Sequence, residues 1–441
     1  MADAAELPPD PTVASEQAVK AELPPEVVAQ TLGEYIRAWT SRIRAGESGV
    51  LPVVAAMIII ALVFTILNPL FLSPVNLVNL FQQSAVFMVL AMAMGFALVL
   101  GEIDLSVGFV GACGAAITVQ LVQPLTTKWA WPLAILAGLA FCLAFGAIQG
   151  TLITRLRLPS FIVTLGGYLI ASGLFLWILQ FGPFSGYPNL AGDSVNLKVI
   201  YDLMWGSIDP IASWILAAVV VAAIGGTMFW SDHRRRSSGL VAPPMSLTII
   251  KVALLAVVAV VVVAICNTNR AVIGNLSGVP WVIPIVLGVL VAWSVLFQRT
   301  RYGRYLYAIG GNAEAARRAG INLAVVRTTA FMLCSFTAGI AMLLYASLLG
   351  GMSNNVQGGQ YVLYAVAAAV IGGTSLFGGR GRPIHGLLGG LVIGGIYNGM
   401  YLLQMSIQWQ YVVTGLVLLA AVTIDAVSRR GSVSGAMGFR F

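Results

Sequence analysis

Long uninterrupted runs of apolar residues occupy most of the chain between positions 51 and 427. The runs lack the alternation of apolar and polar positions that is typical of strands. Most of them reach the roughly 20 residues that an α-helix needs to cross the hydrocarbon of a bilayer. Only helices and closed barrels span lipid, because lipid offers backbone groups no hydrogen-bond partners. The pattern therefore predicts an all-α polytopic membrane protein.

About twelve transmembrane helices follow from these runs. Apolar residues make up 59% of the 441 and charged residues only 9%, which excludes an ordinary soluble domain. The predicted spans are 51–67, 80–100, 105–123, 132–154, 162–181, 211–230, 247–266, 280–297, 328–349, 361–377, 384–403 and 410–427.

The first 50 residues predict a cytoplasmic tail. They hold eight acidic residues and several prolines, which indicates disorder in the first part, and no apolar run that would form a signal peptide. The apolar residues Val28, Leu32, Tyr35, Ile36, Trp39 and Ile43 recur at three- and four-residue steps. This spacing indicates either an amphipathic helix on the inner leaflet or a basic linker beside the membrane.

Lysine and arginine residues set the orientation. With both termini in the cytoplasm, only Lys128, Lys198 and Arg270 of the 24 basic residues lie outside. Basic residues accumulate on the cytoplasmic side, so we prefer this orientation to its reverse. The net charge of +8 then reflects membrane topology. We expect no nucleic-acid partner, because the basic residues are scattered over separate short loops.

No residue pattern predicts an enzyme. The four cysteines stand singly, and neither histidine has a catalytic or metal-binding spacing to a carboxylate or cysteine. The stretch "GTSLFGGR" at 373–380 has the glycine spacing of a phosphate loop, but Gly379 takes the position of its lysine. We interpret it as a glycine-rich turn, and we expect this chain to bind no metal and no cofactor.

Two carboxylates, Glu102 and Asp104, stand in the stretch "GEIDLSVG" at 101–108, at the end of an apolar run. Buried ionisable residues in membrane proteins are commonly functional, so a stand-alone ion-coupled carrier is one hypothesis. Asp104 can instead accept hydrogen bonds from the first free N–H groups of helix 105–123. Asp104 and Ser106 therefore have two possible roles, capping of the helix and lining of a transport pathway.

Other polar and small residues within or beside the spans have two interpretations. Amide side chains within or beside the spans either form interhelical hydrogen bonds or line a polar transport pathway. These are Gln149, Asn398 and Gln404. Residues 372–379, "GGTSLFGG", echo 101–108 and place Ser375 where Asp104 stands, so a residue able to cap recurs. The glycines expected to permit close helix packing are Gly146, Gly150, Gly394, Gly395 and Gly399.

The longest inner loop, 301–327, predicts a short helix. Asn312 can cap it, Glu314 and Arg317 suit its positive and negative ends, and Gly320 can terminate it. Small residues on one side would let a partner approach closely, although an ordinary solvated helix is the alternative. The predicted docking residues are Gly310, Gly311, Asn312, Glu314, Ala315, Ala316, Arg317 and Gly320.

This loop resembles the coupling segment of permease subunits of ATP-binding cassette (ABC) transporters for bacterial monosaccharide uptake, the ribose and xylose type. Its stretch "AIGGNAEAARRAGIN" carries the resemblance together with four others in the same order. These are "GEIDLSVG" (101–108), "RLRLPSFIVTLGG" (155–167), "GGTSLFGGRG" (372–381) and "GGIYNGMYLLQMSIQWQYVVTGLVLLAAVTID" (394–425). The family usually has glycine at position 102, so Asp104 and Ser106 match the pattern while Glu102 departs from it.

The resemblance implies a permease of the bacterial inner membrane that forms half of a dimeric pore for a monosaccharide. Two cytoplasmic ATPase subunits would dock on the coupling helices and use ATP, and an extracytoplasmic binding protein would deliver the sugar. Because the longer members of the family include xylose permeases, we expect a pentose such as xylose. The alternative is a stand-alone ion-coupled sugar carrier that uses Glu102 or Asp104.

The resemblance also implies a core of about ten spans with the coupling helix after the sixth, whereas here it follows the eighth. The two additional spans before the coupling helix predict an extra outer segment and an inserted helix pair. The expected parts are the tail 1–50, a first membrane bundle 51–181, the inserted region 182–270, a second bundle 271–430 with the coupling loop 301–327, and a cytoplasmic tail 431–441.

The charge distribution predicts that residues 193 and 235 lie on opposite sides of the membrane. Single cysteines introduced by Asp193→Cys and Arg235→Cys in a cysteine-free background should react with an impermeant maleimide from outside and from inside, respectively. Labelling of intact cells and of inverted vesicles measures this. Reaction of both positions from the same side would refute the twelve-span arrangement.

Overall fold

The computed structural model describes residues 32–44, 51–124, 127–181, 188–240, 242–271, 274–417, 419–420 and 423. Helices are the only extended regular elements in these residues. Seven of the described helices are long and apolar enough to cross a membrane, and three further apolar helices are shorter. The predicted class, an α-helical polytopic membrane protein, is confirmed at this level.

The helices correspond closely to the predicted spans. Each of the first eleven spans has its own helix, and residues 407–417 are helical at the start of the twelfth. The elements are α3 (Leu32–Arg44), α4 (Leu51–Leu67), η1 (Pro69–Leu72), α5 (Pro74–Val99), α6 (Val107–Leu121), α7 (Trp131–Arg155), α8 (Ser160–Phe181), α9 (Val195–Trp205), α10 (Pro210–Ser237), α11 (Met245–Cys266), α12 (Val282–Arg299), α13 (Arg301–Gly311), α14 (Ala313–Arg318), α15 (Leu323–Leu349), α16 (Gly358–Ile371) and α17 (Pro383–Leu402).

Local hydrogen bonds explain where the helix ends differ from the prediction. Helix α16 ends six residues early, because Gly373 adopts a left-handed φ of +107° and the Thr374 N–H donates to the Ala369 carbonyl at 2.9 Å. Helix α15 begins five residues early, because the Asn322 side chain accepts from the Val325 N–H at 3.2 Å. Hydropathy alone carries neither signal.

The chain divides into two compact units, and the smaller one contains α3, α10 and α11. In this unit, Thr248 of α11 donates a hydrogen bond to Asp232 of α10, and the Lys251 ammonium lies 6.0 Å from the centre of the Tyr35 ring. Helix α3 forms within the segment predicted to be amphipathic, whereas Val28 lies outside the described residues. The position of α3 on a membrane surface and the five-part organisation stay predictions.

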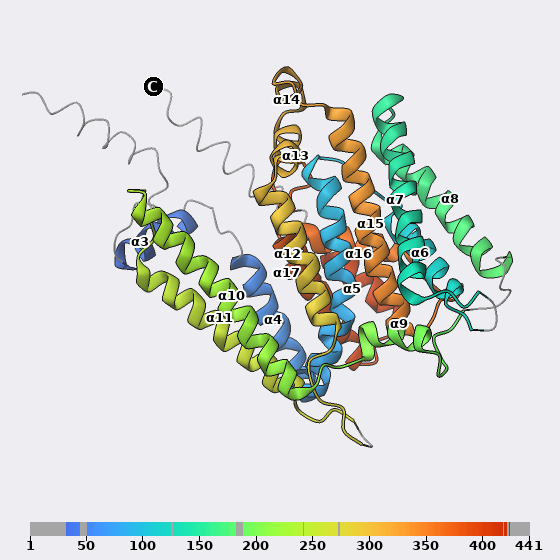
Figure 1. The fold of residues 1–441 in the computed structure, drawn as a ribbon, viewed down its shortest axis with the longest axis horizontal. Coiled ribbons are helices and arrows are strands. Elements are labelled where there is room, and N and C mark those ends of the chain that lie inside the picture. The colour runs from blue at the N-terminus through green and yellow to red at the C-terminus, as the bar shows by residue number, and fades with distance from the viewer. Residues whose placement is uncertain are drawn as a thin grey trace, which may run out of the picture. The chain divides into compact units, whose positions relative to one another are not determined.

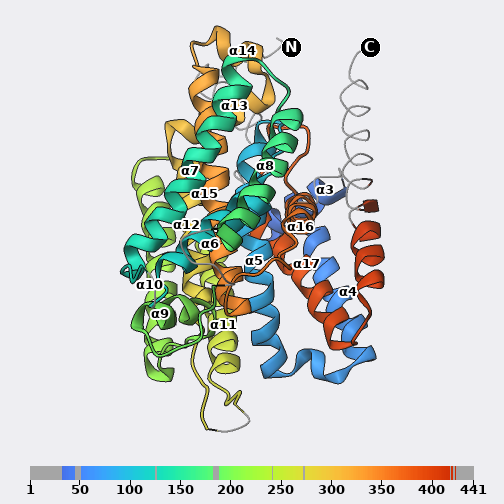
Figure 2. The same ribbon diagram turned by 90° about the vertical axis from the view of Figure 1, so that its right-hand side faces the viewer.

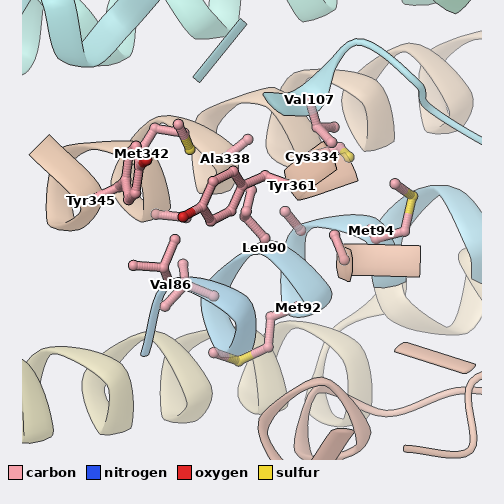
Figure 3. Packing of buried hydrophobic residues seen from close by; sticks show 14 of the residues in the cluster. Val86, Leu90, Met92, Met94, Val107, Cys334, Ala338, Met342, Tyr345 and Tyr361 are labelled. Atoms are coloured by element: carbon pink, nitrogen blue, oxygen red, sulfur yellow. The ribbon is translucent and has the colours of Figure 1, made fainter. Parts of the chain in front are cut away.

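Helix α5 forms the centre of the larger unit. Its residues 85–99 are apolar on all sides and almost entirely buried, as expected for a helix enclosed by others. Helices α6, α15, α16 and α17 pack around it (Figure 1). Figure 3 shows Leu90 of α5 in one cluster with Met342 of α15 and Tyr361 of α16.

Glycines bring α17 and α5 into close contact. Gly386, Gly390 and Gly394 recur every four residues, which places them on one face of α17. A Cβ atom added at Gly390 would lie 2.4 Å from the Met88 Cα, and one at Gly394 would lie 1.9 Å from the Ser84 hydroxyl. Small residues at this spacing permit the near approach of two helix backbones. We call these three residues the glycine ridge.

The other glycines expected at packing positions behave similarly, with one exception. Cβ atoms at Gly146 and Gly150 of α7 would lie within 3 Å of α15 backbone atoms, and one at Gly399 would lie 2.5 Å from the Phe64 ring. At Gly395 the nearest atom, from Ile60, would be 3.4 Å away, which is an ordinary contact. Packing therefore explains every position that we predicted except Gly395.

The two ends of the larger unit carry different short helices. Helices α13 and α14 lie at one end and α9 at the other in both views (Figures 1 and 2). We call these the α14 end and the α9 end. Hydropathy did not predict α9, which is held by hydrogen bonds between its Met204 backbone, Gln82 of α5 and Ser347 of α15.

Candidate functional site

Helix α14 has the local structure that we predicted for the coupling loop. The Asn312 side chain accepts a hydrogen bond from the Ala315 N–H at 2.9 Å and caps the helix. Gly320, with a left-handed φ of +81°, follows the helix, and the Ile321 N–H donates to the Ala316 carbonyl at 3.1 Å. Both ends of α14 thus form as the sequence indicates.

An ion-pair cluster covers the exposed side of α14. Arg317 and Arg318 donate hydrogen bonds to the Glu314 carboxylate at 2.8 and 3.1 Å. The bond from Arg317, followed by that from Arg318, lowers the pKa of Glu314 below its ordinary value. The carboxylate is therefore ionised at neutral pH, and the pairing is lost only as the pH falls through the lowered pKa. Exposed pairs of this kind contribute little stability, so their charges are available to a partner.

The predicted docking residues divide into two groups. Six of them lie exposed on or beside α14, namely Gly311, Asn312, Glu314, Ala315, Arg317 and Gly320. Ala316 is buried and half-buried Gly310 lies against the protein. The two residues therefore attach the loop 301–327, predicted above as the coupling loop and called the coupling segment below, to the membrane helices rather than presenting a surface to a partner.

Gly310 marks a point where three backbone segments meet. A Cβ atom at Gly310 would lie 1.8 Å from the Val99 carbonyl oxygen at the end of α5 and 2.7 Å from the Gly379 nitrogen. The Gly379 N–H donates to the same Val99 carbonyl at 2.9 Å. A Cβ atom at Gly378 would lie 2.8 Å from the Gly310 carbonyl oxygen and 3.0 Å from the Gly101 nitrogen. We call Gly101, Gly310, Gly378 and Gly379 the glycine junction, because no side chain separates the coupling segment from the turns after α5 and α16.

The two turns at the glycine junction share a hydrogen-bonding pattern. The Asp104 carboxylate accepts from the Ser106 N–H at 2.9 Å, and the Ser375 hydroxyl accepts from the Phe377 N–H at 3.0 Å. In both turns the acceptor stands two residues before the donor. The echo between 101–108 and 372–379 thus extends to geometry, with Asp104 and Ser375 in equivalent roles.

Three of the four polar residues predicted to cap helices or line a pathway come together in one buried cluster. The Ser106 hydroxyl donates to Asp104 at 2.6 Å and accepts from the Gln149 amide of α7 at 3.0 Å. Asp104 and Ser106 are fully buried, and Gln149 nearly so. Helix α6 begins at Val107, two residues later than predicted, so Asp104 orders the turn before the helix and does not cap its first free N–H groups.

Glu102, which departs from the family pattern, forms an ion pair with Arg327. Its carboxylate oxygen lies 3.2 Å from the Arg327 Nε, and both side chains are largely buried. Arg327 is the fifth residue of α15 and the last residue of the predicted coupling loop 301–327. The pair is therefore a second connection between the turn after α5 and the coupling segment. Sequence analysis missed Arg327 as a partner because 225 residues separate the two positions.

Asn398 lies apart from that cluster, at the α9 end. It exchanges hydrogen bonds with the Asn76 side chain at 2.9 and 3.2 Å and donates to the side-chain oxygen Oε1 of Gln83 at 3.1 Å. These residues border a pocket of about 510 Å³. The amide side chains that line it are Asn76, Asn79, Gln83, Asn398, Gln404 and Gln410.

Sequence analysis missed the contribution of α5 to this pocket, although a signal was present. Asn76, Asn79 and Gln83 are spaced by three and four residues and therefore share one helix face. The predicted span began only at residue 80, so two of them were assigned to a loop. A helix that starts at Pro74 places all three on α5.

A bundle of apolar helices long enough to cross a membrane defines a polytopic membrane protein. The family follows from sequence comparison, since residues 76–422 match the family described as "branched-chain amino acid transport system / permease component". The chain belongs to this family. It is accordingly a multi-pass protein of the bacterial inner membrane.

Curated relatives include permeases named for sugars. The xylose transport system permease protein XylH of Escherichia coli (strain K12) is 33% identical over 381 residues, which cover 86% of this chain and 92% of that protein. The ribose import permease protein RbsC of the same strain is 29% identical over 375 residues, covering 84% and 92%. RbsC of Bacillus subtilis (strain 168) is 30% identical over 374 residues, covering 84% and 90%. No solved structure matches the chain. The resemblance to ribose- and xylose-type ABC permeases is confirmed.

The glycine junction predicts that only one of two adjacent substitutions lowers the stability of the protein. Gly310→Ala places a methyl group against the Val99 carbonyl and should cost about 1–3 kcal/mol of stability. Gly311→Ala is the matched control, because a Cβ there would meet no atom within 4 Å. Thermal unfolding of the purified protein in detergent measures the difference. Equal melting temperatures for the two variants would contradict the close contact.

The Asp104 turn predicts a graded response to substitution. Asp104→Asn keeps an oxygen for the Ser106 N–H and should assemble and transport almost normally. Asp104→Ala leaves that buried N–H without its acceptor, at a cost of about 1–3 kcal/mol, and Asp104→Leu should be at least as damaging. Folded yield and transport rate, measured together, should fall in parallel. An Asn variant that folds fully but fails to transport would show that the charge itself is needed.

Proposed function

We propose that this chain is the permease subunit of an ATP-driven importer and forms the transmembrane pathway for a monosaccharide. The observation that carries the proposal is the extent of the similarity to XylH and RbsC. Those permeases, named for xylose and ribose, match this chain over 92% of their own lengths in Escherichia coli. The substrate is a pentose in this proposal, and the higher identity to XylH favours xylose.

The proposed assembly contains two copies of this chain, two cytoplasmic ATPase subunits and an extracytoplasmic sugar-binding protein. We propose twelve spans with both termini in the cytoplasm, which places the α14 end inside and the α9 end outside. The charge distribution supports this orientation. The chain binds no cofactor in this assembly, because ATP is used by the ATPase subunits.

The coupling of ATP use to transport runs through α14 in this proposal. An ATPase subunit docks on the exposed face that carries Glu314 and Arg317. Since Gly310 lies directly on the backbones of the turns after α5 and α16, displacement of the coupling segment moves both turns. Helices α6 and α17 follow those turns in the chain. Helices α6 and α17 would therefore reorient when the ATPase subunits close.

The stand-alone ion-coupled carrier is not favoured. Each of its two candidate carboxylates has a partner within the chain, with Glu102 next to Arg327 and Asp104 bonded to Ser106. A carboxylate that carries ions through the membrane must exchange its partner in each cycle. Glu102 instead joins the turn after α5 to α15, and Asp104 orders that turn.

Reconstitution tests the proposed function. In vesicles, uptake of D-xylose should require the ATPase subunit, ATP and the binding protein, and should survive collapse of the proton gradient. Radiolabelled uptake with each component omitted in turn measures this. Sugar accumulation by this chain alone, abolished by an uncoupler, would instead establish the carrier.

A further inference from the structure

The pocket at the α9 end has the chemistry of a binding site for a small polar molecule. It lies between the start of α5, the end of α17 and the residues that follow α17. Its volume of about 510 Å³ is in the range of small-molecule sites. We name it the amide pocket after its six amide side chains. The ring of Tyr401 and the side chains of Leu402 and Met405 complete the wall and supply apolar surface.

The amides of the pocket fall into a structural set and an available set. The side chains of Asn76 and Asn398 are buried and hydrogen-bond to each other. Gln83 accepts from Asn398, while its amide nitrogen donates to no group in the described part of the chain. Among the described residues, the side chains of Asn79 and Gln404 have no hydrogen-bond partner. Donors and acceptors at three positions are therefore available to a ligand.

The backbone at Gln404 is a second, independent observation. Gln404 adopts a left-handed φ of +51° directly after α17, where the Met405 N–H donates to the Met400 carbonyl at 3.0 Å. Glycine is the usual residue at this position of a helix end, because other residues are strained there. Strained positions of this kind cluster at functional sites. A glutamine here retains a side chain in the pocket at the expense of backbone strain.

The lining also indicates what kind of molecule fits. No charged side chain lines the pocket within the described residues. An amino acid would bring a buried ammonium and carboxylate, which are costly without charged partners. A neutral molecule with several hydroxyl groups matches amides, since each amide both donates and accepts. The apolar wall suits the C–H faces of such a molecule.

The amides must also face water rather than lipid. Unpaired polar groups at membrane depth line water-filled cavities or protein interfaces, because lipid cannot satisfy them. The half-buried Asn79 and the exposed Gln404 have no partner in the described chain. A pocket in the transport pathway meets this requirement, because the pathway supplies water.

We propose that the amide pocket is a monosaccharide-binding subsite of the transport pathway, in which Gln83, Asn79 and Gln404 hydrogen-bond the sugar hydroxyls. The proposal rests on the proposed function and adds the location of the sugar. In the proposed orientation the pocket is on the outer side, where a binding protein would release its ligand.

Gln404→Gly is the decisive variant, because glycine relieves the strain while removing the amide. Asn79→Leu removes the second amide with little change in volume. The matched control is Lys128→Gly, which relieves the same backbone strain at φ +54° on an exposed loop outside the pocket. Each variant is assembled with the ATPase and binding protein in vesicles. Melting temperature, ATPase rate, and uptake of labelled D-xylose, D-ribose and L-leucine are then measured.

Gln404→Gly and Asn79→Leu should fold normally and keep the ATPase rate, while pentose uptake at low concentration falls about fivefold to tenfold for each lost amide. Lys128→Gly should transport at the wild-type rate. Pentose uptake equal to that of Lys128→Gly in both pocket variants would overturn the subsite and leave the importer intact. A wild-type assembly that moves L-leucine and neither pentose would overturn the sugar importer and the subsite together.

Discussion

Direct contact between helix backbones is the constraint on which the rest of this structure depends. Inside a membrane the hydrophobic effect gives helices little reason to associate, so close packing must hold them together. The glycine ridge provides such packing between α5 and α17, and the glycine junction provides it between the coupling segment and the membrane helices. In both places a single methyl group would separate the backbones.

Polar side chains gather at the two ends of α5 and are rare along its buried middle. At the α14 end, Glu102 pairs with Arg327 of α15, and Ser106, which donates to Asp104, accepts a hydrogen bond from Gln149 of α7. At the α9 end, Asn76 pairs with Asn398 on α17. Buried polar groups are tolerated where they are paired, and these pairs fix the register of the helices. The amides left over at the α9 end are the ones available for binding.

Local chemistry explains which features the sequence could predict. Apolar runs longer than a bilayer crossing identify helices without further information, and Asn312 and Gly320 define α14 because capping involves only neighbouring residues. The partnership of Glu102 with Arg327 was not accessible, since it arises only when distant segments pack. Helix α9 was missed because it is short and gains its stability from contacts with α5 and α15 rather than from its own hydropathy.

The glycine ridge restricts how α5 and α17 can move. Its period of four residues corresponds to about 6 Å along a helix, so a smaller slide would drive a neighbouring side chain into the opposite backbone. The close contacts therefore resist sliding of α17 along α5. The end of α5 touches the coupling segment, and the opposite end of the helix pair borders the amide pocket. In the proposed mechanism, these two packed helices would transmit a displacement of the coupling segment to the pocket.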